Sequence, residues 1–379
     1  MMRTNKLGIY IHIPFCVRKC NYCDFLSYEG TDEREQENYV QSLLWEMENQ
    51  AEQLQGVSAN SLFLGGGTPS LLNVGLMGRV MEGVHRFFLV EEDAEITMEA
   101  NPGTLTLEKL KAYRCFGVNR MSLGVQSFDD EILTKLGRIH TGQEAIRSYE
   151  MARTAGFDNI NMDLMFGIPG QSQDVWETNL NEAFHCGPEH LSLYGLSIEK
   201  GTKFWQWMEE KTMVACSDAL DRQMYHRGLD LAEERGYEQY EISNLAKPGK
   251  ECAHNIKYWN FSDYLGLGLG AHSFIQGTRI ENTAHWDSYI QGQWVNQRHV
   301  NSWEDSVSEF IFTGLRQVQG IRYADFSRLF GVEFQDYLGS RMEKLATYVQ
   351  EGYVVENQEG LRFTRKGMDF SNPILADLM

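Results

Sequence analysis

The chain carries near its start the stretch His12-Ile-Pro-Phe-Cys16-Val-Arg-Lys-Cys20-Asn-Tyr-Cys23, in which three cysteines follow a C-x3-C-x2-C spacing. Cysteine thiolates hold iron–sulfur cubes, and three thiolates on one loop can hold three irons while the fourth iron stays open to a small molecule. A structural zinc with His12 or a distant cysteine as fourth ligand is the alternative, although zinc ligands usually occur as two separated pairs. The spacing therefore favours a [4Fe-4S] cluster with an exchangeable iron.

The other four cysteines are isolated in the sequence, and an odd total of seven argues against a disulfide framework. A reducing compartment is therefore expected. The first residues, Met1 to Lys6, are polar and lead directly into a strand-like run, so no signal peptide is predicted. No stretch reaches the roughly 18 apolar residues of a membrane span. We expect a cytoplasmic protein without a transmembrane segment.

The length and charge of the chain limit the classes of function. Its 379 residues are enough for two domains with a sizeable core. The 53 acidic and 34 basic residues give a net charge of −19. This charge opposes binding to nucleic acid or to anionic lipid, so neither is an expected partner.

Short apolar runs alternate with segments of helical period along the first half of the chain. Strands are predicted at residues 8–13, 61–64, 95–98, 120–125, 159–165 and 190–196. Helices are predicted between them at residues 33–55, 74–88, 106–116, 142–155 and 174–186. This repeat indicates a parallel sheet of βα units. Six units are too few for a closed eightfold barrel, so the prediction is a partial (β/α)6 barrel, with a doubly wound open sheet as the alternative.

Conspicuous polar and glycine residues follow successive predicted strands. The cysteine loop follows the first strand, Gly65-Gly66-Gly67-Thr68-Pro69 the second, and Glu99 the third. Gln126 follows the fourth strand, and Asp163 lies near the end of the fifth. Each could be an ordinary turn, cap or core residue. Because functional groups of this architecture gather at the carboxyl ends of the strands, their shared placement predicts one ligand-binding mouth.

Two glycine-rich runs differ in their predicted roles. Gly65-Gly66-Gly67 lacks the Gly-Lys-[Ser/Thr] ending of a P-loop and the spacing of a dinucleotide fingerprint. It can let backbone groups approach a ligand closely. The run Leu265-Gly-Leu-Gly-Leu-Gly270 is a poor phosphate loop. It is expected to mark close backbone packing instead.

Five motifs together resemble the oxygen-independent coproporphyrinogen oxidase branch of the radical S-adenosylmethionine (SAM) superfamily, and within it the HemW-type heme chaperones. The resemblance covers essentially the whole chain. It implies a radical SAM core followed by a small C-terminal domain. The motifs are Tyr10-Ile-His-Ile-Pro-Phe-Cys16, Tyr22-Cys23-Asp-Phe25, Gly65-Gly-Gly-Thr-Pro69, Ser122-Leu-Gly-Val-Gln126-Ser-Phe and Asp163-Leu-Met-Phe-Gly-Ile-Pro-Gly170.

The resemblance also implies roles for individual residues around SAM. Its amino group would be held by Gly66, Gly67 and Glu99. Its carboxylate would be held by Thr68 and Arg138, since a guanidinium matches a carboxylate. The ribose hydroxyls would contact Gln126 and Asp163, and the remaining wall of the cavity would be formed by Tyr10, Tyr22 and Ser197. Without the resemblance, Arg138 would be taken for an ordinary cation at a helix end.

One position departs from the oxidase pattern. The oxidase has a further cysteine two positions after the last cluster ligand, where this chain has Phe25, and it has a longer N-terminal segment. Both differences argue against coproporphyrinogen decarboxylation. They do not affect the predicted binding of the cluster or of SAM.

A second motif, His254-Asn255-Ile-Lys-Tyr258-Trp259, lies outside the repeat. Histidine is a common axial ligand of heme iron, and the neighbouring aromatic rings offer flat apolar surface to a porphyrin. A lone histidine beside aromatic residues is more often a hydrogen-bonded core residue. The run matches the H-N-x-x-Y-W motif of the heme chaperones, which implies that His254 is an iron ligand. Cys252 is the second candidate, and no C-x-x-C-H motif for covalent heme attachment occurs.

The segment from Asn301 onward has a different pattern. Helices are predicted at residues 306–317, 322–330 and 335–350, followed by a hairpin at residues 353–363. Three helices and a hairpin are typical of a winged helix, which often binds DNA. The segment has 12 acidic and 8 basic residues, so a role facing protein or covering a cavity is the better prediction.

Three regions are therefore expected: a radical SAM core (1–205), a core extension with the heme motif (206–300) and a winged-helix-like C-terminal domain (301–379). The expected function is that of a heme chaperone that binds a [4Fe-4S] cluster, SAM and heme, and passes heme to an acceptor protein. A respiratory, membrane-associated protein is one candidate acceptor. The alternatives are a radical SAM enzyme, such as the oxidase, which would cleave SAM, and a structural cluster protein without turnover.

Overall fold

The predicted strand–helix repeat forms a block of six adjacent parallel strands in the computed structural model, which describes residues 6–379. Residues 1–5, on which the expectation of no signal peptide partly rests, lie outside the described part. The parallel strands are β1 (Lys6–Ile13), β4 (Ser58–Gly66), β5 (Leu89–Ala100), β6 (Arg120–Gln126), β7 (Ile160–Phe166) and β8 (His190–Gly195).

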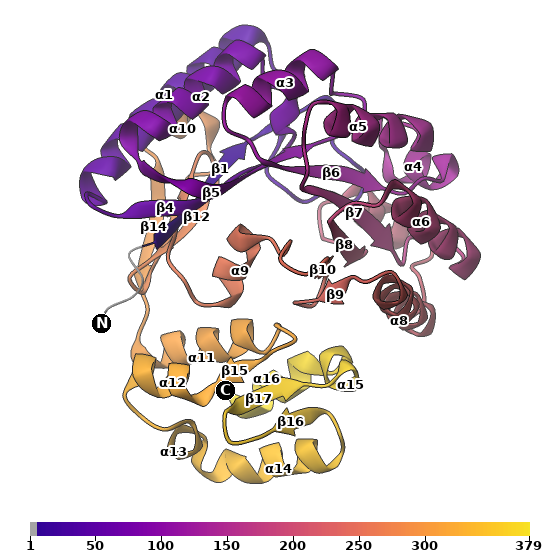
Figure 1. Cartoon of the computed structure of the whole chain (residues 1–379), viewed down its shortest axis with the longest axis vertical. Coiled ribbons are helices and arrows are strands. Elements are labelled where there is room, and N and C mark those ends of the chain that lie inside the picture. The colour runs from indigo at the N-terminus through magenta and orange to yellow at the C-terminus, as the bar shows by residue number, and fades with distance from the viewer. Residues whose placement is uncertain (1–5) are drawn as a thin grey trace.

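The predicted helices cover one side of this sheet (Figure 1). They are α1 (Glu33–Gln53), α2 (Val74–Phe87), α3 (Leu107–Cys115), α5 (Gly142–Thr154) and α6 (Gln173–Cys186). A short helix, α4 (Asp130–Leu136), lies beside them and was not predicted. A doubly wound sheet would carry helices on both faces. The one-sided layer and the curved sheet confirm the partial barrel.

Both edges of the parallel block are extended by strands that the repeat did not predict. At one edge β11 (Tyr264–Leu267) pairs in parallel with β1, and the antiparallel strands β12 (His272–Ile275), β13 (Thr278–Asn282) and β14 (Val295–Val300) follow. At the other edge lie β10 (Asn244–Ala246) and β9 (Glu238–Gln239). The core extension thus continues the sheet of the radical SAM core.

Short elements complete this part of the chain. They are β2 (Phe15–Cys16), β3 (Tyr28–Glu29), η1 (Pro69–Leu71), α7 (Lys203–Glu209), α8 (Asp218–Glu234), α9 (Ala253–Trp259) and α10 (Trp286–Ile290). The pairing of β2 with β3 brackets the cysteine loop. Helix α9 lies between the sheet and the C-terminal domain (Figure 1).

The run Leu265–Gly270 packs closely against its neighbours, as predicted. A Cβ atom at Gly266 would lie 2.1 Å from the carbonyl oxygen of His272. Gly268 has a φ of +101° and donates its N–H to the buried carboxyl of Glu46 at 2.9 Å. Glycine is needed here because a side chain would displace the adjoining backbone.

The C-terminal domain has its own apolar core and a three-stranded sheet in the order β15-β17-β16. Its elements are α11 (Trp303–Gly314), β15 (Ile321–Arg322), α12 (Tyr323–Phe330), α13 (Phe334–Leu338), η2 (Gly339–Arg341), α14 (Met342–Gln350), β16 (Val354–Glu356), β17 (Gly360–Phe363), α15 (Arg365–Asp369) and α16 (Ser371–Leu378). The prediction of one helix at residues 335–350 was wrong, because the chain turns at Gly339 with a φ of +52°. The last two helices were not predicted.

The C-terminal domain packs against the extension of the sheet. Phe261 and Phe274 belong to its apolar core. Ion pairs join the two parts, with Arg279 on β13 2.8 Å from Glu309 on α11, and Arg365 on α15 2.6 Å from Glu233 on α8. These contacts hold the domain across the concave side of the sheet, next to α9. No helix within residues 6–379 is both long and apolar enough to cross a membrane.

Candidate functional site

The three cysteines border one cavity of about 400 Å³ at the carboxyl ends of the strands. All three are partly exposed. Cys16 Sγ lies 3.7 Å from Thr68 Oγ1, and an Nη1–H of Arg138 donates to Cys20 Sγ at 3.4 Å. Burial raises the pKa of the Cys23 thiol to about 11. A bound metal is therefore needed to hold this thiol as a thiolate at neutral pH.

His12, the nearby histidine considered for a zinc site, already uses both ring nitrogens. Its Nε2 lies 2.9 Å from the carbonyl oxygen of Leu26, and its Nδ1 lies 3.0 Å from the Tyr10 hydroxyl. The ring is buried, and burial lowers its pKa. His12 would have to break one of these hydrogen bonds to bind a metal, which makes it a poor fourth ligand beside the three cysteines.

The glycine run approaches the cysteine loop through its backbone. Gly66 donates its N–H to Glu99 Oε2 at 3.0 Å, which joins the ends of β4 and β5. A Cβ atom at Gly67 would lie 2.7 Å from the carbonyl oxygen of Phe15. The run therefore leaves room that any side chain would fill, directly beside Cys16.

Two partly buried carboxyls face this cavity. Burial, and then repulsion by Asp163, raises the pKa of Glu99 to about 8. Burial also raises the pKa of Asp163, which accepts a hydrogen bond from Asn161 Nδ2 at 2.8 Å. Raised carboxyl pKa values mean that ionisation is unfavourable until a positive charge is near. The pair is suited to a ligand that brings a cationic group.

Arg138 supplies the opposite charge in the same cavity. It donates through Nη2 to Asn101 Oδ1 at 2.5 Å and to the carbonyl oxygen of Gly124 at 2.6 Å. Its Nε is buried and has no hydrogen-bond partner among residues 6–379. A buried donor without a partner is costly, so this atom fits an anionic group of a ligand.

Gln126 has a backbone conformation that is rare for its type. Its φ is +67°, at the point where β6 ends. Such a conformation costs on the order of 1–3 kcal/mol and persists where the surroundings impose it, which is often at ligand sites. It directs the chain so that Gln126 lines the cavity.

The structure brings together most, but not all, of the predicted site. The cavity is lined by Tyr10, Cys16, Cys20, Tyr22, Cys23, Gly66, Gly67, Thr68, Glu99, Gln126, Arg138, Asp163, His254, Asn255 and Tyr258. Ser197 does not line it: this residue is exposed and donates its hydroxyl to Glu199. Trp259 does not line it either, because it faces a second cavity.

Further cavity residues were missed in the sequence because they lie inside ordinary strands. Arg120, Asn161, His190, Ser192 and Tyr194 all line the cavity. His190 connects two of its walls, with Nδ1 2.7 Å from Asn161 Oδ1 and Nε2 2.8 Å from the Tyr240 hydroxyl. The signal that could have identified them is the occurrence of polar residues at inward positions of otherwise apolar parallel strands, which are normally buried on both faces.

Helix α9 is anchored to the sheet by Glu95 of β5. The Glu95 carboxylate accepts hydrogen bonds from the N–H groups of Ala253 at 3.0 Å and His254 at 3.1 Å, and from Cys252 Sγ at 3.3 Å. Cys252 is fully buried and does not line the cavity. The same carboxylate thus fixes the start of α9 and engages the thiol that was the second candidate for heme iron.

His254 is 1% exposed and is held on three sides. Its Nδ1 lies 3.0 Å from Ser61 Oγ, its Nε2 lies 2.9 Å from the Tyr258 hydroxyl, and its ring stacks on Phe63 with centroids 5.3 Å apart. Burial lowers its pKa to about 3, so the ring is neutral at physiological pH. Ligation of iron by His254, as predicted, requires it to release one of these two hydrogen bonds.

Comparison with known proteins agrees with this geometry. The Radical SAM superfamily model matches residues 10–182, and the HemN C-terminal domain model matches residues 302–370. The heme chaperone HemW of Escherichia coli (strain K12) is 38% identical over 381 residues, which cover 99% of this chain and 98% of that protein. The chain belongs to the HemW heme chaperone family. The HemW protein of Bacillus subtilis (strain 168) is 35% identical and covers 97% of both chains.

A solved structure supports the architecture. The coproporphyrinogen III oxidase HemN from Escherichia coli, a radical SAM enzyme, superimposes with a TM-score of 0.87 over 100% of this chain and 91% of its own. The identity is 23%, so this likeness shows the fold alone. Membership of the radical SAM superfamily itself implies a [4Fe-4S] cluster and SAM.

Proposed function

We propose that this protein is a radical SAM heme chaperone that holds a [4Fe-4S] cluster on Cys16, Cys20 and Cys23, binds SAM beside it, and carries heme to an acceptor protein. The convergence of the three cysteines, the glycine run and two partly buried carboxyls on one cavity carries the proposal. Family membership supplies the heme cargo.

The residues of the cavity fit the two ends of SAM. Glu99, with the backbone of Gly66 and Gly67, suits the amino group, because a cation there relieves the cost of ionising a buried carboxyl. Arg138 and Thr68 suit the carboxylate, because the Arg138 Nε has no other partner among residues 6–379. The ribose hydroxyls suit Gln126 and Asp163.

When bound, a reduced cluster and SAM supply one-electron chemistry that the side chains of the protein lack. The contribution of the chain is to position these groups and to limit the access of water. Glu99 holds a proton while the cavity is empty and gives it up when a cationic amino group binds. Tyr10 and Tyr22 pack along the cavity wall and restrict solvent.

Phe25 supports a chaperone over an oxidase. It lies two positions after Cys23, lines the mouth of the cavity and is 63% exposed. The oxidase branch has a cysteine at this position. A phenyl ring offers neither a thiol nor a proton donor, so the group available to a decarboxylase is missing here.

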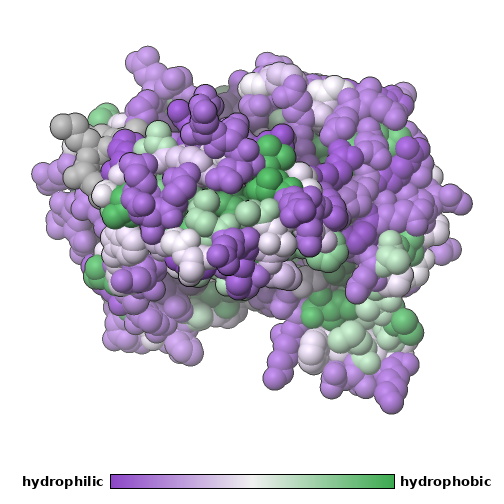
Figure 2. All heavy atoms as spheres, turned by 90° about the horizontal axis from the view of Figure 1, so that it is seen from below, coloured by the Kyte–Doolittle hydropathy of each residue, from purple (hydrophilic) through white to green (hydrophobic). Residues whose placement is uncertain are grey.

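The partner proposed is a heme-acceptor protein, with a respiratory, membrane-associated protein as the candidate. The net charge of −19 and the mostly hydrophilic face in Figure 2 suit a protein partner better than nucleic acid. Apolar residues break that face only in limited patches (Figure 2).

The test is one anaerobic experiment on the reconstituted protein with two readouts. Heme transfer to a heme-free b-type cytochrome is followed by absorption, and coproporphyrinogen decarboxylation is assayed in the same buffer with SAM and a reductant. We expect transfer that is faster than release of heme to solvent, and no decarboxylation above background. Robust decarboxylation without transfer would replace this proposal with the oxidase.

A further inference from the structure

The strand-end cavity, which is the cavity of about 400 Å³ that the three cysteines border, also contains a buried arginine that is not among the residues assigned to SAM. Arg120, the first residue of β6, lines this cavity and is 2% exposed. Its Nε is buried without a hydrogen-bond partner, and its guanidinium forms no hydrogen bond or ion pair within residues 6–379. A buried charged donor without an acceptor is costly, so a ligand is expected to supply the acceptor.

Strand register places Arg120 one layer deeper than the residues assigned to SAM. Glu99 of β5 is in register with Ser122 of β6, whereas Thr97 of β5 is in register with Arg120. Side chains in register lie on the same face of the sheet, and every second residue of a strand returns to that face. Glu99 and Ser122 therefore form one layer inside the barrel, and Thr97 and Arg120 form the next. The deeper layer lies about 6–7 Å closer to the amino ends of the strands.

The polar side chains next to Arg120 are hydrogen-bonded to one another. Asn161 donates to Ser122 Oγ at 2.8 Å, and its Oδ1 lies 2.7 Å from His190 Nδ1. The other ring nitrogen of His190 lies 2.8 Å from the Tyr240 hydroxyl. Burial, and then the charge of Arg120, lowers the pKa of His190, so this ring is neutral. The network leaves Arg120 outside and brings no negative charge to it.

Glu95 balances the charge of Arg120 without forming an ion pair with it. The Glu95 carboxylate accepts the N–H groups of Ala253 and His254 at the start of α9. Burial disfavours the charged form of Arg120, but the influence of Cys252 and Glu95 is larger and raises the pKa. Arg120 therefore stays charged, and its N–H donors have no acceptor within residues 6–379.

Aromatic side chains belong to the same deep layer. Tyr10 of β1 is in register with Phe63 of β4, and Phe63 is in register with Thr97. The rings of Tyr10 and Phe63 stack with centroids 6.3 Å apart. Both line the cavity, as does Tyr258 of α9. A ligand with an apolar body fits between such walls, with a polar group at Arg120.

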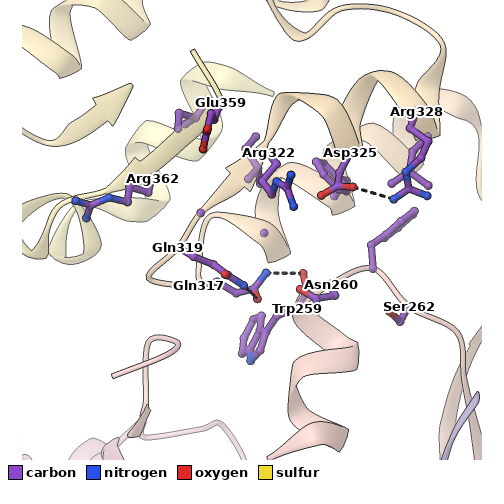
Figure 3. A pocket seen from close by; sticks show the side chains of 18 of the residues that line it. Trp259, Asn260, Ser262, Gln317, Gln319, Arg322, Asp325, Arg328, Glu359 and Arg362 are labelled. Atoms are coloured by element: carbon purple, nitrogen blue, oxygen red, sulfur yellow. Dashed lines mark hydrogen bonds and ion pairs between the residues drawn. The ribbon is translucent and has the colours of Figure 1, made fainter. Parts of the chain in front are cut away.

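The arginines of the second cavity differ from Arg120. This interdomain cavity, of about 550 Å³, lies between the end of α9 and the C-terminal domain (Figure 3). Arg328 is paired with Asp325 at 2.9 Å, and Arg322 and Arg362 are exposed. Exposed guanidinium groups are hydrated by bulk water and require no ligand. Burial removes this option for Arg120, so the need for an anion is greater at Arg120.

The surroundings of Arg120 favour a carboxylate among the anions. The planar fork of a guanidinium matches the two oxygens of one carboxylate. Glu95 and Asp163 are close enough to affect the pKa of Arg120, and their negative charge disfavours a doubly charged phosphate there. A singly charged group on an apolar body is the better match.

We propose that Arg120 binds a carboxylate of a ligand whose apolar body lies between SAM and α9. The inference rests on the proposed function, since it takes SAM to occupy the layers above Arg120. A propionate arm of heme and a free organic acid share this chemistry. In either case the site is separate from Arg138, which is assigned to the carboxylate of SAM.

The test uses the full-length protein, loaded with the cluster and saturated with SAM, and two kinds of probe. Affinity for heme is compared with affinity for heme dimethyl ester, which lacks both carboxylates, by absorption. The urea midpoint is measured with sodium propionate and with sodium chloride at the same concentration. The variants are Arg120→Gln, Arg120→Lys, and Arg298→Gln as a charge-matched control on the exposed strand β14. SAM affinity is measured for each by titration of the paramagnetic cluster signal.

If the carboxylate is a heme propionate, the wild type should bind heme about 10-fold more tightly than the ester, the usual scale for charge-assisted hydrogen bonds. If it is a free acid, propionate should raise the urea midpoint and chloride should not. Either effect should be lost in Arg120→Gln, be reduced in Arg120→Lys, which keeps the charge but not the fork, and persist in Arg298→Gln. SAM affinity should stay within about threefold of the wild type in all three.

Equal binding of heme and its ester by the wild type, with no effect of propionate, would mean that Arg120 contacts only water and would overturn the proposal. A loss of SAM affinity above about 10-fold in Arg120→Gln, at unchanged iron content, would also overturn it, because Arg120 would then belong to the SAM site. Stabilisation by propionate without any heme binding would support the carboxylate site and refute the proposed function. Circular dichroism checks folding, and the comparisons on the wild type and Arg120→Lys decide the matter if Arg120→Gln does not fold.

Discussion

Two cavities contact the short helix α9: the strand-end cavity, at the carboxyl ends of the parallel strands, and the interdomain cavity, between the end of α9 and the C-terminal domain. They are built in opposite ways. The first buries its charges: Glu99 and Asp163 have raised pKa values, and Arg138 is surrounded by hydrogen-bond acceptors. The second keeps its arginines exposed at the mouth. Burying charges fixes them in place for chemistry, whereas exposed charges can release a ligand at little cost. The contrast predicts that the strand-end cavity holds a ligand more firmly than the interdomain cavity does.

The largest expected effect concerns the cluster. Cys20→Ala should leave two thiolates, which are too few to hold the cube, so iron, sulfide and SAM binding should all be lost. Iron and sulfide analysis after anaerobic reconstitution, with a SAM titration, checks this expectation. Cys115→Ala, at the exposed end of α3, is the matched control. Recovery of stoichiometric zinc without sulfide in the wild type would contradict the cluster assignment.

A smaller effect concerns the charge that SAM brings. Glu99→Gln should weaken SAM binding about 10-fold at pH 8 and leave the cluster intact, because the side chain contacts the ligand and not the iron. In the wild type, SAM affinity should increase as pH rises toward the Glu99 pKa of about 8, since ionised Glu99 attracts the amino group. Titration of the paramagnetic cluster signal with SAM at pH 6 and 8 measures this. Equal pH dependence in Glu99→Gln would contradict the role of Glu99.

The raised pKa of Glu99 also predicts how stability depends on pH. The stability of the empty protein should fall as pH rises, whereas the affinity for SAM should increase. The pKa of Glu99 is raised from 4.5 to about 8 in the folded protein, so the unfolded chain ionises first. Stability of the empty protein should therefore fall as pH rises between these two values, by about 1.4 kcal/mol for each pH unit. Glu99→Gln should be the more stable protein at pH 8 and no more stable at pH 4.5. Urea unfolding at the two pH values measures this difference, and equal midpoints at pH 8 would contradict the raised pKa of Glu99.

The next effect concerns α9, the helix between the two cavities. Glu95→Gln should weaken the anchor of α9 and lower the free energy of unfolding by about 1–3 kcal/mol, because charge-assisted hydrogen bonds to Ala253 and His254 are lost. Affinity for SAM and for heme should fall together. Glu91→Gln on the same strand is the control, since an ion pair with the exposed Lys6 adds little stability. If the affinity for only one of the two ligands fell, α9 would not support both binding sites.

The smallest effect is expected at the interdomain cavity itself. Arg322→Gln should change the free energy of unfolding by less than about 0.5 kcal/mol, because the side chain is exposed and has no partner among residues 6–379. Urea unfolding without ligand checks this value. A loss above about 1 kcal/mol would mean that Arg322 supports the fold, and the contrast between the cavities would then be weaker than described.

Much of the strand-end cavity could be predicted because its signals are local. The cysteine spacing, the glycine run and the groups after each strand, such as Glu99 and Asp163, depend only on the order of strands and helices. Arg120 and His190 were missed because a polar residue in an apolar strand indicates an unusual position but not the face of the sheet on which the side chain lies. Their position follows from the curvature of the sheet and its single layer of helices, which only the three-dimensional structure defines.

The interdomain cavity could not be predicted, because it depends on distant parts of the chain meeting. His254 and Trp259 belong to one sequence motif, yet they line different cavities at the two ends of α9. In the sequence, Arg322 belongs to a predicted helix. Its place on a strand follows only from the pairing of β15 with β17. Likewise, residues 335–350 have the period of one helix, but the turn at Gly339 divides them into two helices.

The central claim is that the strand-end cavity binds SAM beside a cluster held by Cys16, Cys20 and Cys23, and equilibrium dialysis of cluster-loaded protein with SAM tests it most directly. The account predicts one SAM per chain for the wild type and loss of SAM binding in Cys20→Ala, which cannot hold the cluster. SAM binding by Cys20→Ala with the affinity of the wild type would contradict it.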